Sequence, residues 1–179
     1  MKQEYIAPKN WEIFRPYFKK IDVSAKTILL QEGEISRTMY FIEKGCLRTW
    51  INNDGKEITT QFFFEGESVS SIESFRTNKT SLYSIESIEQ CTLQTLSQKD
   101  FQQIIESNPE MKNDFEAHLF KRLFQTQQFA FSYLKNNPQQ RYEELITQFP
   151  HIVQRVPQHY IASYLGITSV SLSRIRNRQ

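Results

Sequence analysis

The sequence has few of the residues that metal binding and most enzyme chemistry require. Its 179 residues include two cysteines and three histidines, and neither cysteine has a cysteine or histidine neighbour at a spacing typical of a metal site. We expect Cys46 and Cys91 to be buried thiols, because two cysteines cannot hold an iron–sulfur cluster without other ligands. The histidines are scattered, and no pair of nucleophile and base can be identified. We therefore predict no catalytic residue, no metal site and no cofactor.

Long apolar runs are also absent. No run approaches the ~18 residues that a membrane span needs, and the N-terminus lacks the charged and apolar regions of a secretory signal. With 13% aromatic residues, the composition is that of a packed globular protein, long enough for one sizeable domain and a smaller second one. These features predict a cytoplasmic protein that does not bind membranes.

Glycine is scarce, but its spacing is regular. Four of the five glycines lie between positions 33 and 66, at intervals of twelve, ten and eleven residues. Short β-branched and aromatic runs between such turn signals are typical of an antiparallel sandwich, roll or barrel, and Asn53-Asp54-Gly55 is the strongest hairpin signal. A short helix and then a loop are predicted for residues 4–21. The predicted strands are Thr27–Leu30, Met39–Ile42, Cys46–Ile51, Glu57–Phe64, Tyr83–Ile88 and Thr92–Leu96.

Helical patterns follow the strands. Ser97 is a candidate cap for a short helix, and Asn108 or Ser107 can cap a second one with Pro109 at its first position. Nothing breaks the second pattern before residues 136–138, so a helix of about 28 residues is predicted.

The long helix carries more apolar surface than packing on one domain would use. The simplest explanation is a twofold homodimer in which the two copies of this helix pack together. The alternative is a helix that its own domain covers completely. The apolar residues lie in two neighbouring stripes, Met111, Phe115, Leu119 and Leu123 in one and Phe120, Phe124 and Phe131 in the other.

A helix-turn-helix pattern occupies residues 158–178. A first helix with an apolar face around Ile161 ends at Gly166, where a positive φ is common. Thr168 is a candidate N-cap for the second helix, and Leu172 and Ile175 form its inward face. The other side chains of the second helix are predicted to point outwards: Ser169, Val170, Ser171, Ser173, Arg174 and Arg176.

Positive charge is concentrated at the same end of the chain. From Arg155 onwards there are four arginines and no carboxylate, while the preceding residues hold eighteen basic and twenty acidic side chains. An unopposed positive surface on a helix can displace counterions from a phosphate backbone. The C-terminal segment is therefore predicted to face an anionic partner.

Several motifs are shared with a known family. They are LQEGE at 30–34, YFIEKG at 40–45, DGKE at 54–57, Gly66-Glu67, and IASYLGIT and LSRIR near the C-terminus. Together they resemble the cAMP receptor protein and FNR (Crp/Fnr) family of bacterial transcription regulators, and Arg141-Tyr142 and residues 154–157 are similar to its Bacteroidetes branch. The resemblance implies an α+β fold. It consists of an antiparallel cyclic-nucleotide-binding β-roll (a double-stranded β-helix or jelly roll) at 1–108, a dimerisation helix at 109–136, and a helix-turn-helix DNA-binding domain without a full wing at 137–179.

The resemblance also implies a ligand site, with one departure. In cAMP-binding members the Glu of a Gly-Glu pair holds the ribose, helix-start amides cradle the phosphate, and an Arg neutralises it. Here Ser81 or Thr80 stands where that Arg is expected. Losing such a contact costs roughly 2–4 kcal/mol, so we expect an unidentified small-molecule effector other than cAMP, or none, with Glu67 then only a turn carboxylate. The predicted pocket comprises Gly66, Glu67, Ser68, Lys79, Thr80 and Ser81.

The second helix of the helix-turn-helix is implied to read DNA. Arg174 matches a base-reading arginine of the family, whereas Ser169 and Val170 replace an Arg and a Glu, which predicts a different operator. We expect Arg176 and Arg178 to contact phosphates. The predicted DNA-binding residues are Ser169, Val170, Ser171, Ser173, Arg174, Arg176 and Arg178.

The leading hypothesis is a homodimeric transcription regulator that reads an inverted repeat in double-stranded DNA, with RNA polymerase as a further candidate partner. Its roll either senses a nucleotide-like or other small ligand or has lost that ability. The alternative is a small-molecule binding module whose terminal helices contact a protein instead of DNA. A DNA affinity that falls steeply with salt distinguishes the first from the second.

Overall fold

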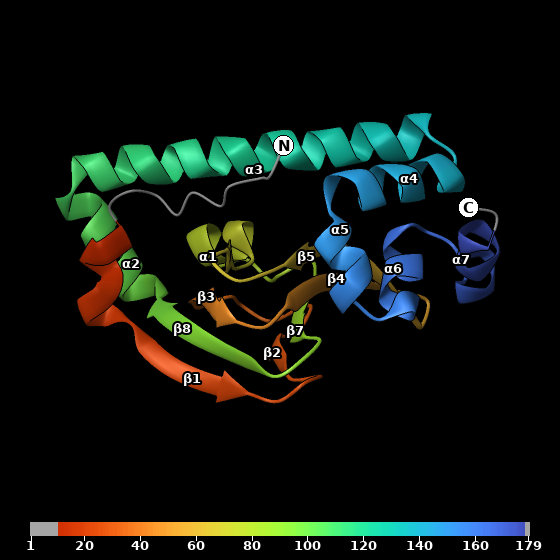
Figure 1. Cartoon of the computed structure of the whole chain (residues 1–179). Helices are drawn as coiled ribbons and strands as arrows, with labels where there is room; N and C mark the ends of the chain where they lie inside the picture. Colours follow the sequence, from red (N-terminus) through yellow and green to blue (C-terminus); the bar gives the residue numbers. More distant parts are fainter. Residues whose placement is uncertain (1–10, 178–179) are drawn as a thin grey trace.

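The computed structural model describes residues 11–177, which form a β-roll, one long helix and a group of short C-terminal helices (Figure 1). The roll contains η1 (Trp11–Tyr17, a 3₁₀ helix), β1 (Lys19–Val23), β2 (Ile28–Leu30), β3 (Thr38–Lys44), β4 (Leu47–Asn53), β5 (Lys56–Phe63), β6 (Ser68–Val69), α1 (Ile72–Thr77), β7 (Ser84–Ser87) and β8 (Cys91–Ser97). The helices that follow are α2 (Gln98–Ser107), α3 (Pro109–Lys135), α4 (Pro138–Gln148), α5 (Pro150–Arg155), α6 (Gln158–Tyr164) and α7 (Ser169–Arg176).

The strands form two antiparallel sheets, in the orders β1-β8-β3-β6 and β2-β7-β4-β5. The predicted hairpin joins β4 to β5: Asn53 pairs with Lys56, and the two residues between them, Asp54 and Gly55, have φ of 52° and 82°. Two successive positive φ values are typical of the type I′ turn, whose twist matches that of the strands. The core of the roll consists of Leu30, Ile42, Leu47, Phe63, Val69, Ile85, Cys91 and Leu93.

Gly45 links β3 to β4 where the chain passes close to β8. Its φ is 108°, and a Cβ at this position would lie 2.5 Å from the Cys91 sulfur, so only glycine fits. Cys46 and Cys91 are buried and unbridged, which confirms the prediction of buried thiols. Burial raises the pKa of the Cys46 thiol above its ordinary value, so this sulfur stays protonated.

Some short elements differ from the sequence-based prediction. β1 lies where a loop is predicted, because it is an edge strand whose side chains are exposed or half-buried and give no strong apolar pattern. β6 and α1, with two and six residues, are too short for a periodic signal. The sequence pattern predicts a helix over residues 138–149 that ends at Phe149-Pro150, but α5 begins at Pro150, since proline is also suited to a first helical turn.

The long helix α3 confirms the predicted span. The Asn108 side chain accepts a hydrogen bond from the Met111 N–H at 3.1 Å, and Pro109 occupies the first turn. Figure 1 shows α3 running along one side of the whole molecule. Its first turns are covered by the roll and α2, and Met111 and Phe115 are buried there. Further along, large apolar side chains are exposed: Phe120, Leu123, Phe124, Phe131, Tyr133 and Leu134.

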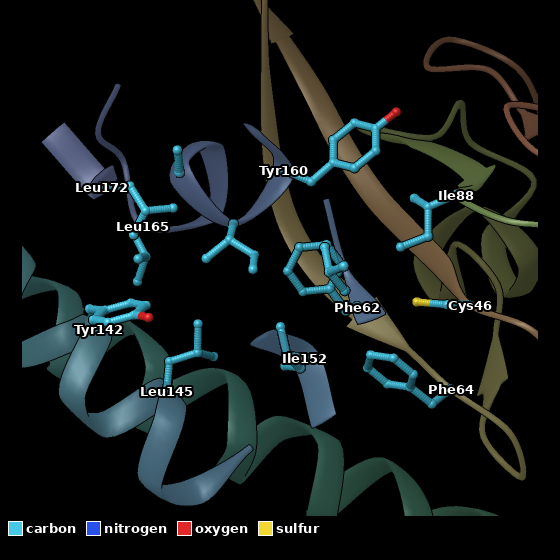
Figure 2. Close-up of a cluster of buried hydrophobic side chains, with 13 residues drawn as sticks. Cys46, Phe62, Phe64, Ile88, Tyr142, Leu145, Ile152, Tyr160, Leu165 and Leu172 are labelled. Atoms are coloured by element: carbon cyan, nitrogen blue, oxygen red, sulfur yellow. The ribbon is translucent and has the colours of Figure 1, made fainter. Parts of the chain in front are cut away.

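The C-terminal helices share a core with the roll, shown in Figure 2. Phe62, Phe64, Cys46 and Ile88 contribute from the roll side. Tyr142, Leu145, Ile152, Val156, Tyr160, Ile161, Ala162, Leu165 and Leu172 contribute from α4 to α7. Because this cluster is continuous, the position of the last two helices relative to the sheets is set by apolar packing. No helix in the described part of the chain is both long and apolar enough to span a bilayer.

Candidate nucleic-acid interface and ligand site

The predicted helix-turn-helix is formed by α6, a glycine turn and α7. Gly166 has φ of 68°, and the Ile167 N–H returns to the Ala162 carbonyl at 2.9 Å to close the end of α6. A Cβ at Gly166 would lie 1.9 Å from the Tyr133 hydroxyl, so a larger residue would have to displace that side chain as well as adopt a strained positive φ. The Thr168 hydroxyl accepts from the Ser171 N–H at 3.2 Å and caps α7 as predicted.

One face of α7 is buried and the opposite face is open. Leu172 is 1% exposed and anchors the helix in the core. Ser171 is half-buried, and its hydroxyl lies 3.0 Å from that of Thr168. Arg178 lies outside the described residues. The exposed side chains are Ser169, Val170, Ser173, Arg174 and Arg176.

The two described arginines of α7 have exposed guanidinium groups that could contact a partner. Within residues 11–177 neither Arg174 nor Arg176 forms an ion pair. The alternative role for Arg174 is a scaffold ion pair with Glu143 or Glu144 of α4, but Glu144 accepts hydrogen bonds from Ser132 and Asn136, and Glu143 accepts from Gln139. Exposed guanidinium groups without carboxylate partners can contact phosphates or base edges.

Arg155 does not belong to this positive surface. The sequence pattern groups it with the C-terminal arginines, but its guanidinium pairs with Glu65 at 2.7 Å and also with Glu89, both on the roll. The Arg155 guanidinium lowers the pKa of the Glu65 carboxyl to about 2. The prediction of four unopposed arginines is therefore wrong for Arg155, because charge counting along the chain cannot see carboxylates that the fold brings alongside.

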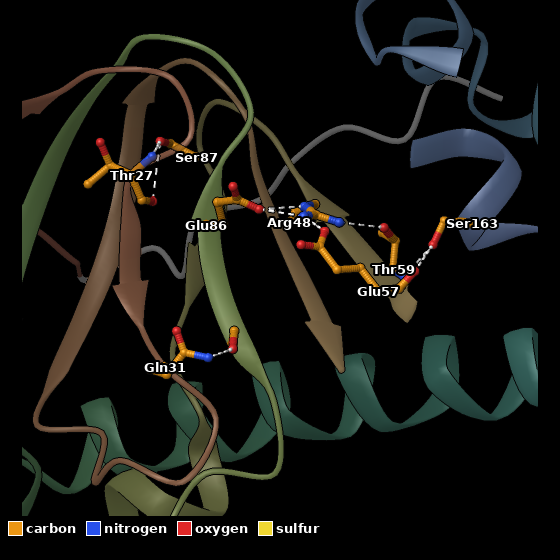
Figure 3. Close-up of polar contacts among 9 residues, drawn as sticks. Thr27, Gln31, Arg48, Glu57, Thr59, Glu86, Ser87 and Ser163 are labelled. Carbon is orange, nitrogen blue, oxygen red and sulfur yellow. Dashed lines mark hydrogen bonds and ion pairs between the residues drawn. The ribbon is translucent and has the colours of Figure 1, made fainter. Parts of the chain in front are cut away.

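Helix α6 is fixed to the outer strand of the second sheet by a polar contact that sequence reasoning missed. The Ser163 hydroxyl accepts from the Thr59 N–H at 2.9 Å and donates to the Glu57 carbonyl at 2.8 Å. It thereby satisfies backbone groups of β5 that no neighbouring strand pairs, since β5 is last in its sheet. Figure 3 shows Ser163 lying against this edge.

Arg48 lies beside that contact and is 1% exposed. Its Nε donates to Glu86 at 2.8 Å, one terminal nitrogen donates to Thr59 at 3.1 Å, and the other also pairs with Glu57 (Figure 3). The guanidinium carbon lies 4.0 Å from the centre of the Tyr160 ring of α6. A buried charge needs such complete pairing, so this network joins the roll to the helix-turn-helix. An arginine inside an otherwise strand-like run was the signal in the sequence.

The predicted ligand residues fall into two groups. Gly66, with φ of 82°, and Glu67 form the turn before β6, and Ser68 is buried in β6 opposite Phe41. Lys79 and Thr80 are exposed in the loop after α1, whereas Ser81 is buried. Among the described residues, no hydrogen bond or ion pair joins the first group to the second. The Lys79 ammonium instead lies 3.5 Å from Glu73.

Glu67 is held by its own chain. One carboxylate oxygen accepts from the Phe64 N–H at 2.8 Å, and the other lies 3.9 Å from a guanidinium nitrogen of Arg122 on α3. Burial raises the pKa of this carboxyl. Arg122 also donates to Gln61 at 3.4 Å, and its guanidinium carbon lies 4.5 Å from the centre of the Phe63 ring. Sequence reasoning missed Arg122, because 55 positions separate it from Glu67.

Tyr83 is the second residue that sequence reasoning missed at this site. Its hydroxyl donates to the Ser70 carbonyl at 3.0 Å, just before α1. Burial raises the pKa of Tyr83, while the Ser71 hydroxyl, the Arg122 charge and the Ile72 backbone act in the opposite direction. The phenol therefore lies at the start of α1. Within the described residues, no group of three side chains has the composition of a metal site.

Comparisons with known proteins agree with this architecture. Residues 20–108 match the family model of the cyclic nucleotide-binding domain. The cAMP-activated global transcriptional regulator CRP of Escherichia coli is 26% identical over 100 residues, which cover 55% of this chain and 48% of that protein. The chain thus spans about half the length of the curated relatives it matches.

Solved structures extend the likeness to most of the chain. The c-di-GMP responsive global regulator CLP of Xanthomonas campestris has a TM-score of 0.72 at 19% identity, covering 93% of this chain and 88% of that one. FixK2 of Bradyrhizobium japonicum has a TM-score of 0.76 at 13% identity, covering 90% and 83%. These likenesses confirm the predicted α+β fold of a β-roll, a long helix and C-terminal helices. The Escherichia coli and Xanthomonas campestris proteins are both named as global regulators.

Proposed function

We propose that the chain is a sequence-specific DNA-binding transcription regulator of the Crp/Fnr type, on the premise that residues 20–108, which match the model of the cyclic nucleotide-binding domain, form its sensor. The observation that carries the proposal is the outward face of α7. This face presents hydroxyls, one apolar side chain and two arginines without ion pairs in residues 11–177, on a helix anchored by Leu172. Such a face can enter a major groove, which admits one α-helix.

Each outward residue has a proposed role. Arg174 reads a guanine, because a guanidinium can donate two hydrogen bonds to the O6 and N7 atoms of that base. Ser169, Val170, Ser171 and Ser173 supply hydroxyl contacts and one apolar contact, for instance to a thymine methyl group. Arg176 and Arg178 contact phosphates and position the helix without reading sequence.

We propose that the active species is a parallel homodimer formed through α3. The exposed fractions of Phe120, Phe124 and Phe131 are 58%, 57% and 59%, which is unusual for three aromatic residues on one helix of a monomer. Two copies related by a twofold axis cover these side chains and place the α7 helices one DNA turn apart, about 34 Å, so the operator is an inverted repeat.

The remaining assignments rest on the same premise. We propose the division into a sensor roll at 1–108, a dimerisation helix at 109–136 and a DNA-binding part at 137–179, a position in the Bacteroidetes branch, a location in the cytoplasm, and RNA polymerase as a partner. The alternative function is a small-molecule binding module whose terminal helices contact a protein.

Fluorescence anisotropy on labelled duplexes selected from random DNA tests the proposal. We expect binding whose affinity falls steeply as salt rises, because each phosphate contact releases counterions. The control is a protein with Arg174 and Arg176 both changed to alanine, since both side chains are exposed and the core is left intact. If the unaltered protein shows no DNA binding at low salt, the alternative function is the correct one.

A further inference from the structure

Helix α4 carries one arginine, Arg141, whose guanidinium lies where two other helices end. One terminal nitrogen donates to the Asn136 carbonyl at 2.8 Å and to the Tyr133 carbonyl at 3.4 Å, both at the C-terminal end of α3. The other terminal nitrogen donates to the Leu165 carbonyl at 2.8 Å, at the C-terminal end of α6. The last carbonyls of a helix have no partner within it and carry partial negative charge, so this one cation stabilises both helix ends.

Neighbouring side chains extend this junction to the turn of the helix-turn-helix. The Arg141 guanidinium carbon lies 4.3 Å from the centre of the Tyr133 ring. The Tyr133 hydroxyl lies against Gly166, where a Cβ would be only 1.9 Å away. Glu144, three residues along α4, accepts from the Asn136 side chain at 2.6 Å. The turn is therefore attached to the end of α3 through α4, which Figure 1 shows between α3 and the last two helices.

The apolar core does not provide this attachment. Among the described residues, the cluster shared by the roll and α4 to α7 includes no side chain of α3. The cluster fixes the helix-turn-helix relative to the sheets, whereas the dimer proposed above is formed through α3. One aromatic pair, Phe129 of α3 and Tyr164 of α6, has its ring centres 4.9 Å apart and supplements the polar contacts. Hydrogen bonds are directional and apolar contacts are not, so the bonds of Arg141 are the ones suited to fixing an angle.

The Arg141 side chain also carries a cost. Its Nε is buried without a hydrogen-bond partner among the described residues, and leaving a buried donor unpaired is unfavourable. An apolar side chain would fill the same space without that cost. Filling space therefore does not explain an arginine at this position, whereas joining two helix ends does.

From these contacts, and on the basis of the DNA-binding dimer proposed above, we infer that Arg141 is a positioning residue for operator recognition. It locks the turn of the helix-turn-helix to the last turn of α3 and thereby sets the separation and rotation of the two α7 helices about the twofold axis. Arg141 thus selects the spacing between operator half-sites without reading a base itself.

The first test measures DNA affinity against half-site spacing. Anisotropy is recorded on duplexes whose half-sites are moved one base pair at a time, which changes their separation by about 3.4 Å and their rotation by about 35° per step. We expect the wild type to bind one spacing at least about tenfold more tightly than its neighbours, and Arg141→Met to differ by less than about threefold across them. Lys135→Met is the matched control, because it removes the same charge from an exposed side chain in the last turn of α3. It should keep the wild-type profile.

An isolated half-site duplex separates positioning from a general structural role, because it engages only one α7 helix. Arg141→Met and Lys135→Met should bind this duplex with equal affinity. A wild-type spacing profile in Arg141→Met, or a loss of half-site affinity confined to that variant, overturns the inference. No DNA binding by the wild type removes the proposed function itself, and the second test then decides the role of Arg141.

The second test needs neither DNA nor a partner copy. Spin labels are attached to one chain carrying Thr126→Cys on α3 and Ser173→Cys on α7, both at exposed positions. The native cysteines, Cys46 and Cys91, are buried and stay unlabelled. Double electron–electron resonance then reports the distance from α3 to α7, with an excess of unlabelled protein so that each labelled chain is measured alone.

We expect one narrow distance in the otherwise unaltered chain and with Lys135→Met, and a broader distribution with Arg141→Met. Arg141→Lys keeps the charge and most of the stem, so it remains informative if Arg141→Met does not fold. It should broaden the distribution as well, because a single ammonium group lacks the fork of donors that joins two helix ends. A narrow, unchanged distance in both Arg141 variants overturns the inference.

Discussion

The stretch from Gly66 to Tyr83, here the cassette, and α7 are built from the same kinds of side chains but hold them in opposite states. In the cassette, Ser81 and Glu67 are bonded to neighbouring backbone groups, and Arg122 of α3 lies beside Glu67. On α7, Ser173 and Arg174 face solvent without such partners in the described part of the chain. Hydrogen-bonding capacity that the fold has already used contributes to stability, while capacity left open is available for a partner. The comparison supports the proposal that α7 carries the binding function.

A third region connects the two. The Arg48 network and Ser163 hold α6 on β5, and the apolar cluster around Phe62 and Ile161 continues this contact. α7 packs on α6 in turn, so its direction follows from the roll. Changes in this connecting region should therefore affect folding first and DNA binding only as a consequence.

The largest expected effect comes from removing the buried guanidinium. Arg48→Met leaves Glu86, which is 8% exposed, without its cation, and breaking a buried pair in this way costs about 3–5 kcal/mol of unfolding free energy. Urea denaturation measures the change. Lys79→Met is the matched control, because the ion pair of Lys79 is exposed and contributes little. If the two variants have equal unfolding free energies, the buried Arg48 network does not contribute measurably to the stability of the fold.

The next effect concerns the dimer. Phe120 and Phe124 are stacked 6.4 Å apart on the exposed side of α3, and Phe124→Asp puts a charge into the surface that the second copy should cover. Each buried phenylalanine contributes about 1.5–3 kcal/mol and a twofold interface uses it twice, so sedimentation should show monomers. Thr126→Asp is the control, since it is exposed and lies about 200° around the helix. Dimers that persist in Phe124→Asp would contradict pairing through this stripe.

A smaller effect distinguishes phosphate contact from base reading on α7. Arg176→Ala should weaken binding to all DNA sequences alike and reduce the slope of log affinity against log salt by about one. Anisotropy over a salt series, on operator and on unrelated duplex, measures both quantities. A loss confined to the operator would assign Arg176 to sequence reading instead.

The smallest effect is a pH dependence at the contact between Arg155 and Glu65. Because the pKa of Glu65 is lowered to about 2 in the folded state, this pair stabilises the fold above the ordinary carboxyl pKa, and the contribution disappears as pH falls towards 2. The stability difference between wild type and Arg155→Met should therefore shrink between about pH 5 and pH 2. It should be small throughout, because both side chains are partly exposed. If the unfolding free energies of the two proteins change with pH in parallel, the Arg155–Glu65 pair does not cause this pH dependence.

Much of the fold could be predicted because its signals are local. Asp54-Gly55, Asn108 with Pro109, and Thr168 determine a hairpin and two helix starts within three or four residues. Elements without such signals were missed. β1 is an edge strand with few buried side chains, and the proline at the start of α5 has the same appearance in a sequence as a proline that ends a helix.

The candidate sites likewise contain residues whose placement could be predicted from the sequence and residues whose placement could not. The outward residues of α7 follow from helical periodicity once Leu172 is placed inside. The partners of Glu67 and Arg155 could not be predicted in this way. Arg122 reaches Glu67, and Glu65 reaches Arg155, only because the fold packs together elements that are 55 and 90 positions apart. Tyr83 was predicted only as the first residue of a strand, and its hydroxyl bond to Ser70 depends on where α1 lies.

Selection of binding sites from random DNA, with the wild type and with Arg174→Ala in parallel, tests the central claim most directly. The account predicts that the wild type enriches an inverted repeat with half-sites one helical turn apart. It also predicts that Arg174→Ala loses preference at one guanine per half-site, with discrimination there falling by about 1–3 kcal/mol. Arg174→Lys, which retains the charge but not the paired donors, should lose the same preference. An unchanged motif for Arg174→Ala, or no enriched motif for the wild type, would contradict the account.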